Sequence, residues 1–225
     1  MGLEKNNFQG EIFARIISDG SIRVKSREGV EEAVRRDYEL KDGTKGYKWE
    51  LVYSTLSGLI DKLEFQDSDY GENLNITIDG IVLSVGVGDS YGQDLMKKLP
   101  NADFTKKIIV APYSFMDDEG KNRKGITLYQ DKQKLRSYFH GKNEAGEWEA
   151  LNDYPVPDGD TEFYKKNDWK IFYLKVEKFL IDYTQKQIIP KLSAALAKTP
   201  LTDKEDKFPE EIPASNEGEG MEVPF

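Results

Sequence analysis

The sequence predicts a mainly β protein with additional helices, and three observations support this fold class. Short segments in which apolar and polar side chains alternate recur between residues 47 and 130, which is the period of half-buried strands. A short segment near residue 90 and a long segment after residue 168 instead carry apolar side chains at helical spacing. The chain of 225 residues is also long enough to bury a sizeable core.

The first part of the chain predicts an N-terminal β extension. Residues 11–40 contain short apolar stretches interrupted by Asp19-Gly20 and Gly29, which indicates weak strands. The alternation then becomes regular in a strand whose apolar side chains are Tyr47, Trp49, Leu51 and Tyr53. The pattern does not settle whether Trp49 and Tyr53 are core or stacking residues, but their shared face with an aliphatic side chain favours the core.

Residues 57–131 predict the element order of a five-stranded OB-type barrel, in which a short helix lies between the third and fourth strands. Asp79-Gly80 is a strong hairpin turn, because both positions tolerate positive φ. The helix is expected over residues 90–99, before Pro100. The strands are expected at residues 59–65, 74–78, 81–87, 106–116 and 126–130.

The last part of the chain predicts a loop over residues 141–167, a long helix from Asp168 that is interrupted at Pro190, and a tail. The tail has eight acidic and two basic side chains and three prolines, with too few apolar side chains to offset the entropy of ordering. We therefore assign residues 1–200 to a single OB-type domain with extensions, and residues 201–225 to a disordered acidic C-terminal tail.

The composition excludes several classes of function. With no cysteine and a single histidine, the chain has no disulfides, thiolate metal sites, cysteine nucleophiles or multi-histidine metal sites. No segment has the roughly 18–20 apolar residues of a membrane span, and residues 1–5 lack the apolar run of a signal peptide. We expect a cytoplasmic protein that is not an enzyme, needs no cofactor and has no membrane partner.

Three adjacent acidic residues, Asp117, Asp118 and Glu119, allow two interpretations. They could ligate magnesium in a nuclease, or they could form an acidic β-turn that Gly120 closes. The sequence favours the turn. The glycines of residues 86–92 favour a strand-to-helix connection over a dinucleotide-binding loop, because their spacing does not match and no βαβ repeat surrounds them.

The charge is distributed unevenly, and this points to nucleic acid. Residues 97–136 contain ten basic and five acidic side chains, although the whole chain has a net charge of −9. On the strand that ends at Met116, the alternation places Tyr113 and Phe115 on one face, with aliphatic side chains behind them. Single-stranded nucleic acid is bound by such stacking rings together with cations that contact phosphates. The candidate DNA-binding residues are Lys106, Lys107, Tyr113, Phe115, Lys121, Arg123, Lys124, Tyr129, Lys132, Lys134, Arg136, Tyr138 and Phe139.

The last residues, Gly220 to Phe225, resemble the tail of bacterial single-stranded DNA-binding proteins, which ends in acidic residues followed by Ile-Pro-Phe. A basic OB-like body with an acidic tail that ends in Phe is also similar to the ssDNA-binding proteins of tailed bacteriophages. Within the body, residues 113–117 and 128–130 are similar to phage members. Bacterial homologues are shorter and tetrameric and lack the long helix after Asp168, so the phage type fits better and the oligomeric state stays open.

The resemblance implies a sequence-tolerant ssDNA-binding protein for phage DNA replication, recombination and repair, in the cytoplasm of a bacterial host. It implies that the tail recruits partner enzymes through Glu222, Val223, Pro224 and Phe225. A terminal Phe presents a ring and a carboxylate together, and an acidic tail can also compete with DNA for a basic groove. Two alternatives remain: an acidic partner-binding or DNA-mimic protein without ssDNA affinity, and a metal-dependent nuclease.

Overall fold

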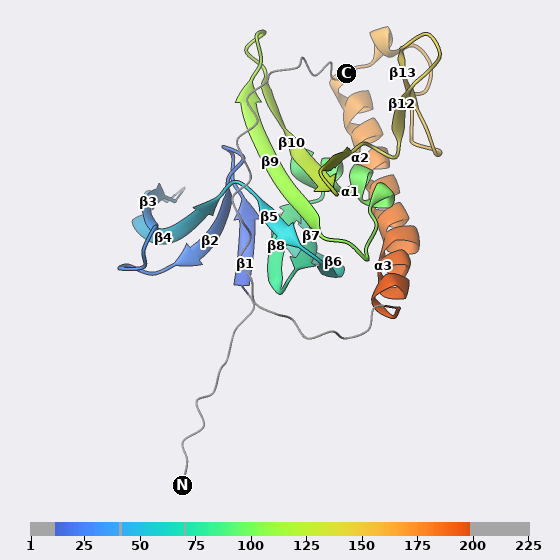
Figure 1. The fold of residues 1–225 in the computed structure, drawn as a ribbon. Helices are drawn as coiled ribbons and strands as arrows, with labels where there is room; N and C mark the ends of the chain where they lie inside the picture. The colour runs from blue at the N-terminus through green and yellow to red at the C-terminus, as the bar shows by residue number, and fades with distance from the viewer. Residues whose placement is uncertain (1–11, 41, 70, 199–225) are drawn as a thin grey trace.

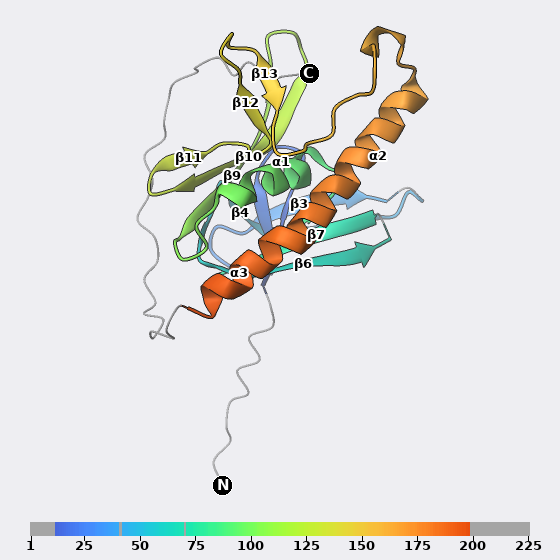
Figure 2. The ribbon, with the colours of Figure 1, turned by 90° about the vertical axis from the view of Figure 1, so that its right-hand side faces the viewer.

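The computed structural model describes residues 12–40, 42–69 and 71–198, so the predicted tail lies outside the described residues. The fold is mainly β. Two sheets and a two-stranded ribbon are accompanied by a short helix and by a long C-terminal helix that lies across one side (Figures 1 and 2).

The seven-stranded sheet contains, in spatial order, β3 (Val34–Glu39), β4 (Lys45–Tyr53), β2 (Ile22–Ser26), β1 (Ile12–Ile16), β8 (Ile81–Gly86), β7 (Gly71–Ile78) and β6 (Ile60–Ser68). The four-stranded sheet contains β11 (Gln133–Leu135), β10 (Asn122–Gln130), β9 (Ile108–Met116) and β5 (Leu56–Gly58). The ribbon contains β12 (His140–Lys142) and β13 (Trp148–Ala150). The helical segments are α1 (Ser90–Lys98), η1 (Leu99–Asn101), η2 (Thr161–Phe163), α2 (Lys166–Tyr183), η3 (Thr184–Ile188) and α3 (Ile189–Leu196).

The predicted order of three strands, a helix and two strands is present as β6, β7, β8, α1, β9 and β10, but these strands do not close into a barrel. The chain crosses between the sheets at Leu59, which separates β5 from β6. On the side of the two sheets away from this crossing, β8 pairs in parallel with β1 from the N-terminal extension, and β10 pairs with β11. The two sheets therefore remain separate at this side.

Helix α1 lies along the part of β10 that β11 does not reach (Figure 2). The Asp94 carboxylate accepts hydrogen bonds from the backbone N–H of Ile126, at 2.8 Å, and from the Lys98 ammonium, at 2.7 Å. Lys98 also donates to the carbonyl of Ile126. Two side chains of α1 thus satisfy backbone groups that a neighbouring strand would otherwise pair.

The core lies between the sheets and under the helices. It contains aliphatic side chains of β6 to β10 together with residues of α1, and α2 to α3 contribute Val176, Leu180, Ile188 and Leu192. These four are spaced by four or eight residues, so they form one stripe along the C-terminal helix. The long helix therefore covers the core beside α1, as Figure 2 shows.

Two expectations on element bounds are wrong, and a third is confirmed in part. Strand β10 begins at Asn122, not at residue 126, because a tight turn at Asp117–Lys121 leaves the following residues free to pair with β9. The expected loop over residues 141–167 contains the β12–β13 ribbon. The C-terminal helix begins at Lys166, and the interruption predicted at Pro190 is present as five π-helical residues that separate α2 from α3 and accommodate the missing N–H of the proline.

Candidate nucleic-acid interface

The register of β9 and β10 places most of the predicted residues of these strands on one face. Phe115 lies opposite Arg123, and Tyr113 lies opposite Gly125. Tyr129 lies opposite Lys134 of β11. Directly paired residues of antiparallel strands share a face. We call this surface the β9–β10 face, and its members are Ile109, Ala111, Tyr113, Phe115, Arg123, Thr127, Tyr129 and Lys134.

In one half of the hairpin, residues 108–110 and 126–128, the reverse face of these strands is the core face, whereas Met116 near the tip is 64% exposed on that face. Ile108, Val110, Ile126 and Leu128 have no exposed surface. This burial fixes the orientation of the hairpin, because a shift of one residue would turn the aliphatic side chains outward. The predicted segregation of aromatic from aliphatic side chains on this strand is therefore confirmed.

Two aromatic rings lie next to each other on the β9–β10 face. The ring centroids of Tyr113 and Phe115 are 5.8 Å apart, with a tilt of 34° between the ring planes. Phe115 is 47% exposed, whereas Tyr113 is half-buried. Burial, with a contribution from nearby Asp94, raises the pKa of the Tyr113 hydroxyl to about 12, so the ring stays uncharged at neutral pH. Phe115 thus offers an accessible neutral ring, supported from the side by Tyr113.

Three of the predicted cations already have acidic partners. Lys106 pairs with Asp131 at 2.7 Å, and Lys121 pairs with Glu119 at 2.7 Å. Arg123 pairs with an Asp117 oxygen at 2.6 Å. Part of their positive charge is therefore compensated, although all three pairs are accessible to water and are worth little in stability.

The other predicted cations, Lys107, Lys124, Lys132, Lys134 and Arg136, form no salt bridge within the described residues. Lys134 extends the β9–β10 face beside Tyr129, whereas Lys124 is paired with Ser114 and points to the reverse side of the hairpin. Burial, followed by the charge of neighbouring Lys98, lowers the pKa of Lys134. An anion at this position would relieve that repulsion between cations.

The acidic residues Asp117, Asp118 and Glu119 form the β-turn that the sequence favours, and Gly120 closes it. One Asp117 oxygen accepts the backbone N–H groups of Glu119 and Lys121, and the other binds Arg123. The hydrogen bond from Lys121 is the largest of the influences that lower the pKa of the Asp117 carboxyl. Gly120 closes the turn by donating to the Asp117 carbonyl. No group of three potential metal ligands occurs in the described part of the chain.

Tyr138 and Phe139 do not belong to this surface. Phe139 has 0% exposure and packs among the rings of Tyr154, Phe179 and Tyr183. Tyr138 is half-buried, with its ring centroid 5.9 Å from that of Tyr183. The prediction for Phe139 is therefore wrong, because a ring buried in the core has no face available to a base. The sequence gives no warning of this, since the helix that covers Phe139 lies 40 residues further along the chain.

The aromatic residues of β4 differ in their exposure. Trp49 is half-buried, but Tyr53 is exposed, so the core interpretation does not hold for Tyr53. The single histidine, His140, is half-buried against the ring of Tyr154 at a centroid distance of 4.5 Å. It is therefore adjacent to the buried aromatic cluster.

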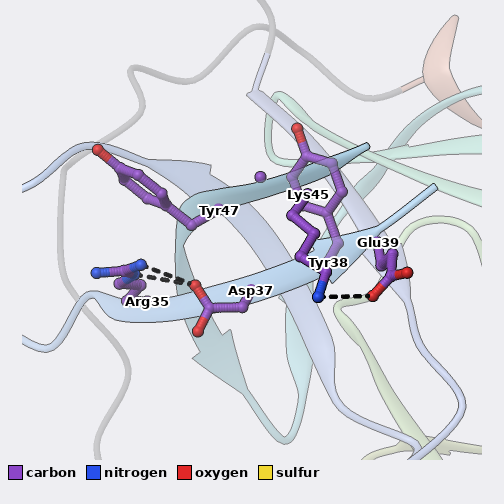
Figure 3. Close-up of a pocket in the computed structure, with 7 residues that line it drawn as sticks. Arg35, Asp37, Tyr38, Glu39, Lys45 and Tyr47 are labelled. Atoms are coloured by element: carbon purple, nitrogen blue, oxygen red, sulfur yellow. Dashed lines mark hydrogen bonds and ion pairs between the residues drawn. The ribbon is translucent and has the colours of Figure 1, made fainter. Parts of the chain in front are cut away.

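A shallow pocket at the β3–β4 hairpin brings together Arg35, Asp37, Tyr38, Lys45 and other residues (Figure 3). The Arg35 guanidinium lies 4.3 Å from the centroid of the Tyr47 ring and pairs with Asp37 at 3.0 Å. Lys45 pairs with Glu39 at 3.5 Å. Because two cations are balanced by two carboxylates, this pocket has no charge excess that would favour a phosphate.

A second basic cluster lies on the N-terminal strands and was not expected from the sequence. Four cations from β1 to β4 surround the carboxylate of Glu50. Their positions are far apart in the sequence, and only the pairing of the strands brings them together. The one local sign is a spacing of two residues, between Arg23 and Lys25 and between Lys48 and Glu50, which places both side chains of each pair on the same face of a strand.

Comparison with known proteins identifies no relative. No model of a known protein family matches the chain, no curated protein matches it, and no solved structure is similar to it. Within the described residues, no helix combines the length and the apolar character needed to cross a membrane. The predicted tail residues Glu222, Val223, Pro224 and Phe225 lie outside the part of the chain that the structure describes.

Proposed function

We propose that this chain binds single-stranded DNA, with little sequence preference, through the β9–β10 face, in phage DNA replication and recombination. The observation that carries the proposal is the accessible ring of Phe115, adjacent to Tyr113 and opposite Arg123 on a hairpin that is anchored by its buried aliphatic half. Stacking of a base on an aromatic ring contributes about 1–3 kcal/mol and tolerates any base. The cations at the edges of the face then supply the salt-dependent part of the affinity.

We interpret the fold as an open form of the OB architecture. The order β6, β7, β8, α1, β9 and β10 supports this interpretation, as does the pairing of β5 with β9 in one sheet while β6 pairs with β7 in the other. In this view the N-terminal strand β1 occupies the edge of β8 that would complete a barrel, and α1 occupies the edge of β10. The chain catalyses no reaction.

Unpaired bases are the ligand that fits such a face best. In a duplex the bases are stacked within the helix, so a flat exposed ring has no base face to contact unless the duplex opens. We therefore expect a preference for single strands over duplex DNA. We propose in addition that the tail end, Glu222 to Phe225, binds replication and recombination enzymes.

The test is a titration of labelled oligo-dT, about 30 nucleotides long, which exceeds the reach of one OB-type site. Fluorescence anisotropy is recorded at low and moderate salt, beside a duplex of the same length. We expect preferential binding of the single strand and an affinity that falls with salt.

The Phe115→Ala variant identifies the surface. It should weaken binding by about tenfold, which corresponds to loss of one stacked base. The matched control is Phe163→Ala, because Phe163 is 78% exposed but lies on η2, away from β9 and β10. Equal losses in both variants would reject the β9–β10 face, and absence of binding at low salt, with residues 201–225 also removed, would reject the function.

A further inference from the structure

The second basic cluster is built on one carboxylate. One oxygen of Glu50 lies 2.7 Å from Arg15 and 3.0 Å from Lys48. The other lies 3.1 Å from Arg36 and 3.6 Å from Arg23. These residues come from four strands, β1 to β4. We call Glu50 and its four cations the Glu50 cluster.

The cluster has far more positive than negative charge. Glu50 is 2% exposed, so its carboxylate is almost completely removed from water, whereas the side chains of the four cations keep between 15% and 50% of their surface. One carboxylate cannot accept all the donors of three guanidinium groups and an ammonium group. The Nε of Arg36 and the second Glu50 oxygen, both buried, form an ion pair outside hydrogen-bonding geometry. Donors on the exposed side therefore remain available to an anion.

The same face of the sheet adds a further cation and exposed rings. Lys25 is paired with Glu50 across β2 and β4, so it lies on the cluster's face, and it is exposed with no salt bridge in the described chain. Phe13 precedes Arg15 by two residues on β1 and is exposed. Tyr38 follows Arg36 by two residues on β3 and is exposed too. Cations interleaved with accessible rings are again the composition of a single-strand binding surface.

One turn connects this face with the β9–β10 face. Gly20, in the turn between β1 and β2, packs so closely on β9 that an added Cβ would lie 2.7 Å from the backbone nitrogen of Ser114 and 2.8 Å from the carbonyl carbon of Tyr113. In the same turn, Asp19 binds Arg23 at 3.2 Å. The turn thus contacts the strand that carries the stacking rings and a cation of the Glu50 cluster.

We infer that the Glu50 cluster is a second phosphate-binding surface, and that a DNA strand bound on the β9–β10 face continues past the β1–β2 turn onto it. The buried carboxylate acts as an organiser, because it holds four cationic side chains in place before the ligand arrives, which reduces the entropy lost on binding. This inference rests on the proposed function and extends it to a longer strand.

The test compares two lengths of oligo-dT with the full chain. An oligonucleotide of about 8 nucleotides is short enough to occupy the β9–β10 face alone, whereas one of about 30 nucleotides can reach both surfaces. The variant is Arg15→Gln with Lys25→Gln, since both side chains are exposed and Glu50 keeps three partners. The control is Lys178→Gln with Lys186→Gln, which removes the same charge from the C-terminal helix.

For the long oligonucleotide, we expect the slope of log affinity against log salt to become shallower by about 1.4 in the variant, because each phosphate contact of a single strand contributes about 0.7. The short oligonucleotide and the control should keep their slopes. Urea unfolding midpoints of the variant, the control and the wild-type chain show whether all three are folded. If Arg15→Gln unfolds the chain, the Lys25→Gln variant is used alone, and the slope of log affinity against log salt is expected to become shallower by about 0.7.

The outcomes separate the two proposals. A variant that binds the long oligonucleotide with the wild-type slope would overturn the second surface and leave the proposed function intact. An equal change in the variant and the control would overturn it as well, because the effect would then come from overall charge. If the wild-type chain binds neither length, the proposed function fails, and the second surface fails with it.

Discussion

The Tyr113 hydroxyl lies over Gly125, in the space that a Cβ at position 125 would occupy, and an Asp94 carboxylate oxygen lies 2.6 Å from that same position. Three elements meet at this point: β9 through Tyr113, β10 through Gly125 and α1 through Asp94. The aromatic residue of the candidate interface is therefore positioned by the contact that holds α1 against β10.

Gly125→Ala tests this packing. The added methyl group must displace the Tyr113 ring or Asp94, so we expect a loss of about 1–3 kcal/mol in the free energy of unfolding. We also expect weaker ssDNA binding, because Tyr113 supports Phe115. Urea denaturation measures the first effect and anisotropy the second. Gly88→Ala is the control, because a Cβ there meets only the flexible end of Glu177. An unchanged stability in Gly125→Ala would contradict the packing.

The pair of Asp94 and Lys98 is expected to stabilise the junction of α1 and β10. Lys98 is buried, so Asp94→Ala leaves its ammonium without a carboxylate and leaves the N–H of Ile126 without an acceptor. We expect a loss of about 3 kcal/mol. Adding Lys98→Met should recover part of this loss, because it removes the uncompensated charge. A double-mutant cycle in urea measures the coupling, and strictly additive losses would show that the pair does not act together.

Stability is expected to fall between pH 7.5 and pH 5.5 because of His140. Burial, followed by the charge of Lys97, lowers the pKa of this side chain from 6.5 to about 4. The unfolded chain therefore takes up a proton near pH 6.5 while the folded chain remains neutral, so the folded state loses relative stability as the pH falls through this window.

The expected loss is about 1 kcal/mol, which allows for the partial access of water to the ring. Urea unfolding at the two pH values measures it. His140→Gln should remove the difference, and because the chain has a single histidine, no other imidazole can replace the effect. A variant that keeps the full pH dependence would assign it to carboxyl groups instead.

Deletion of residues 201–225 should tighten ssDNA binding at low salt. The segment has eight acidic side chains against two basic ones, so it can compete with DNA for the cations of the interface at a high effective concentration. The gain should disappear as salt screens the charges. The control is a tail of equal length in which the eight acidic residues are replaced by their amides. Equal or weaker binding after deletion would contradict the competition.

The local parts of the fold were predictable from the sequence, and the long-range pairings were not. The alternation of Leu74, Ile76 and Ile78 depends only on neighbouring residues, so the order of strands and α1 followed from it. The parallel pairing of β1 with β8 depends on two segments that no local pattern links. For this reason the sequence suggested a closed barrel where the structure has an open arrangement.

The candidate site shows the same division. The face shared by Tyr113 and Phe115 followed from their spacing of two residues, and the structure confirms that they are adjacent. The burial of Phe139 and the assembly of four cations around Glu50 depend on tertiary packing and on strand register. A single sequence specifies neither, because many registers place charged residues opposite one another.

The position of β1 has a consequence for the order of folding during synthesis. Ile12 is made well before Ile81, which is its partner in the sheet. The central strand of the larger sheet therefore has only β2 beside it until β8 has left the ribosome, and its hydrogen-bonding edge stays open for that time. Closing so long a loop costs entropy before the contacts repay it, which slows folding. A chaperone that covers the first strands would act in this interval.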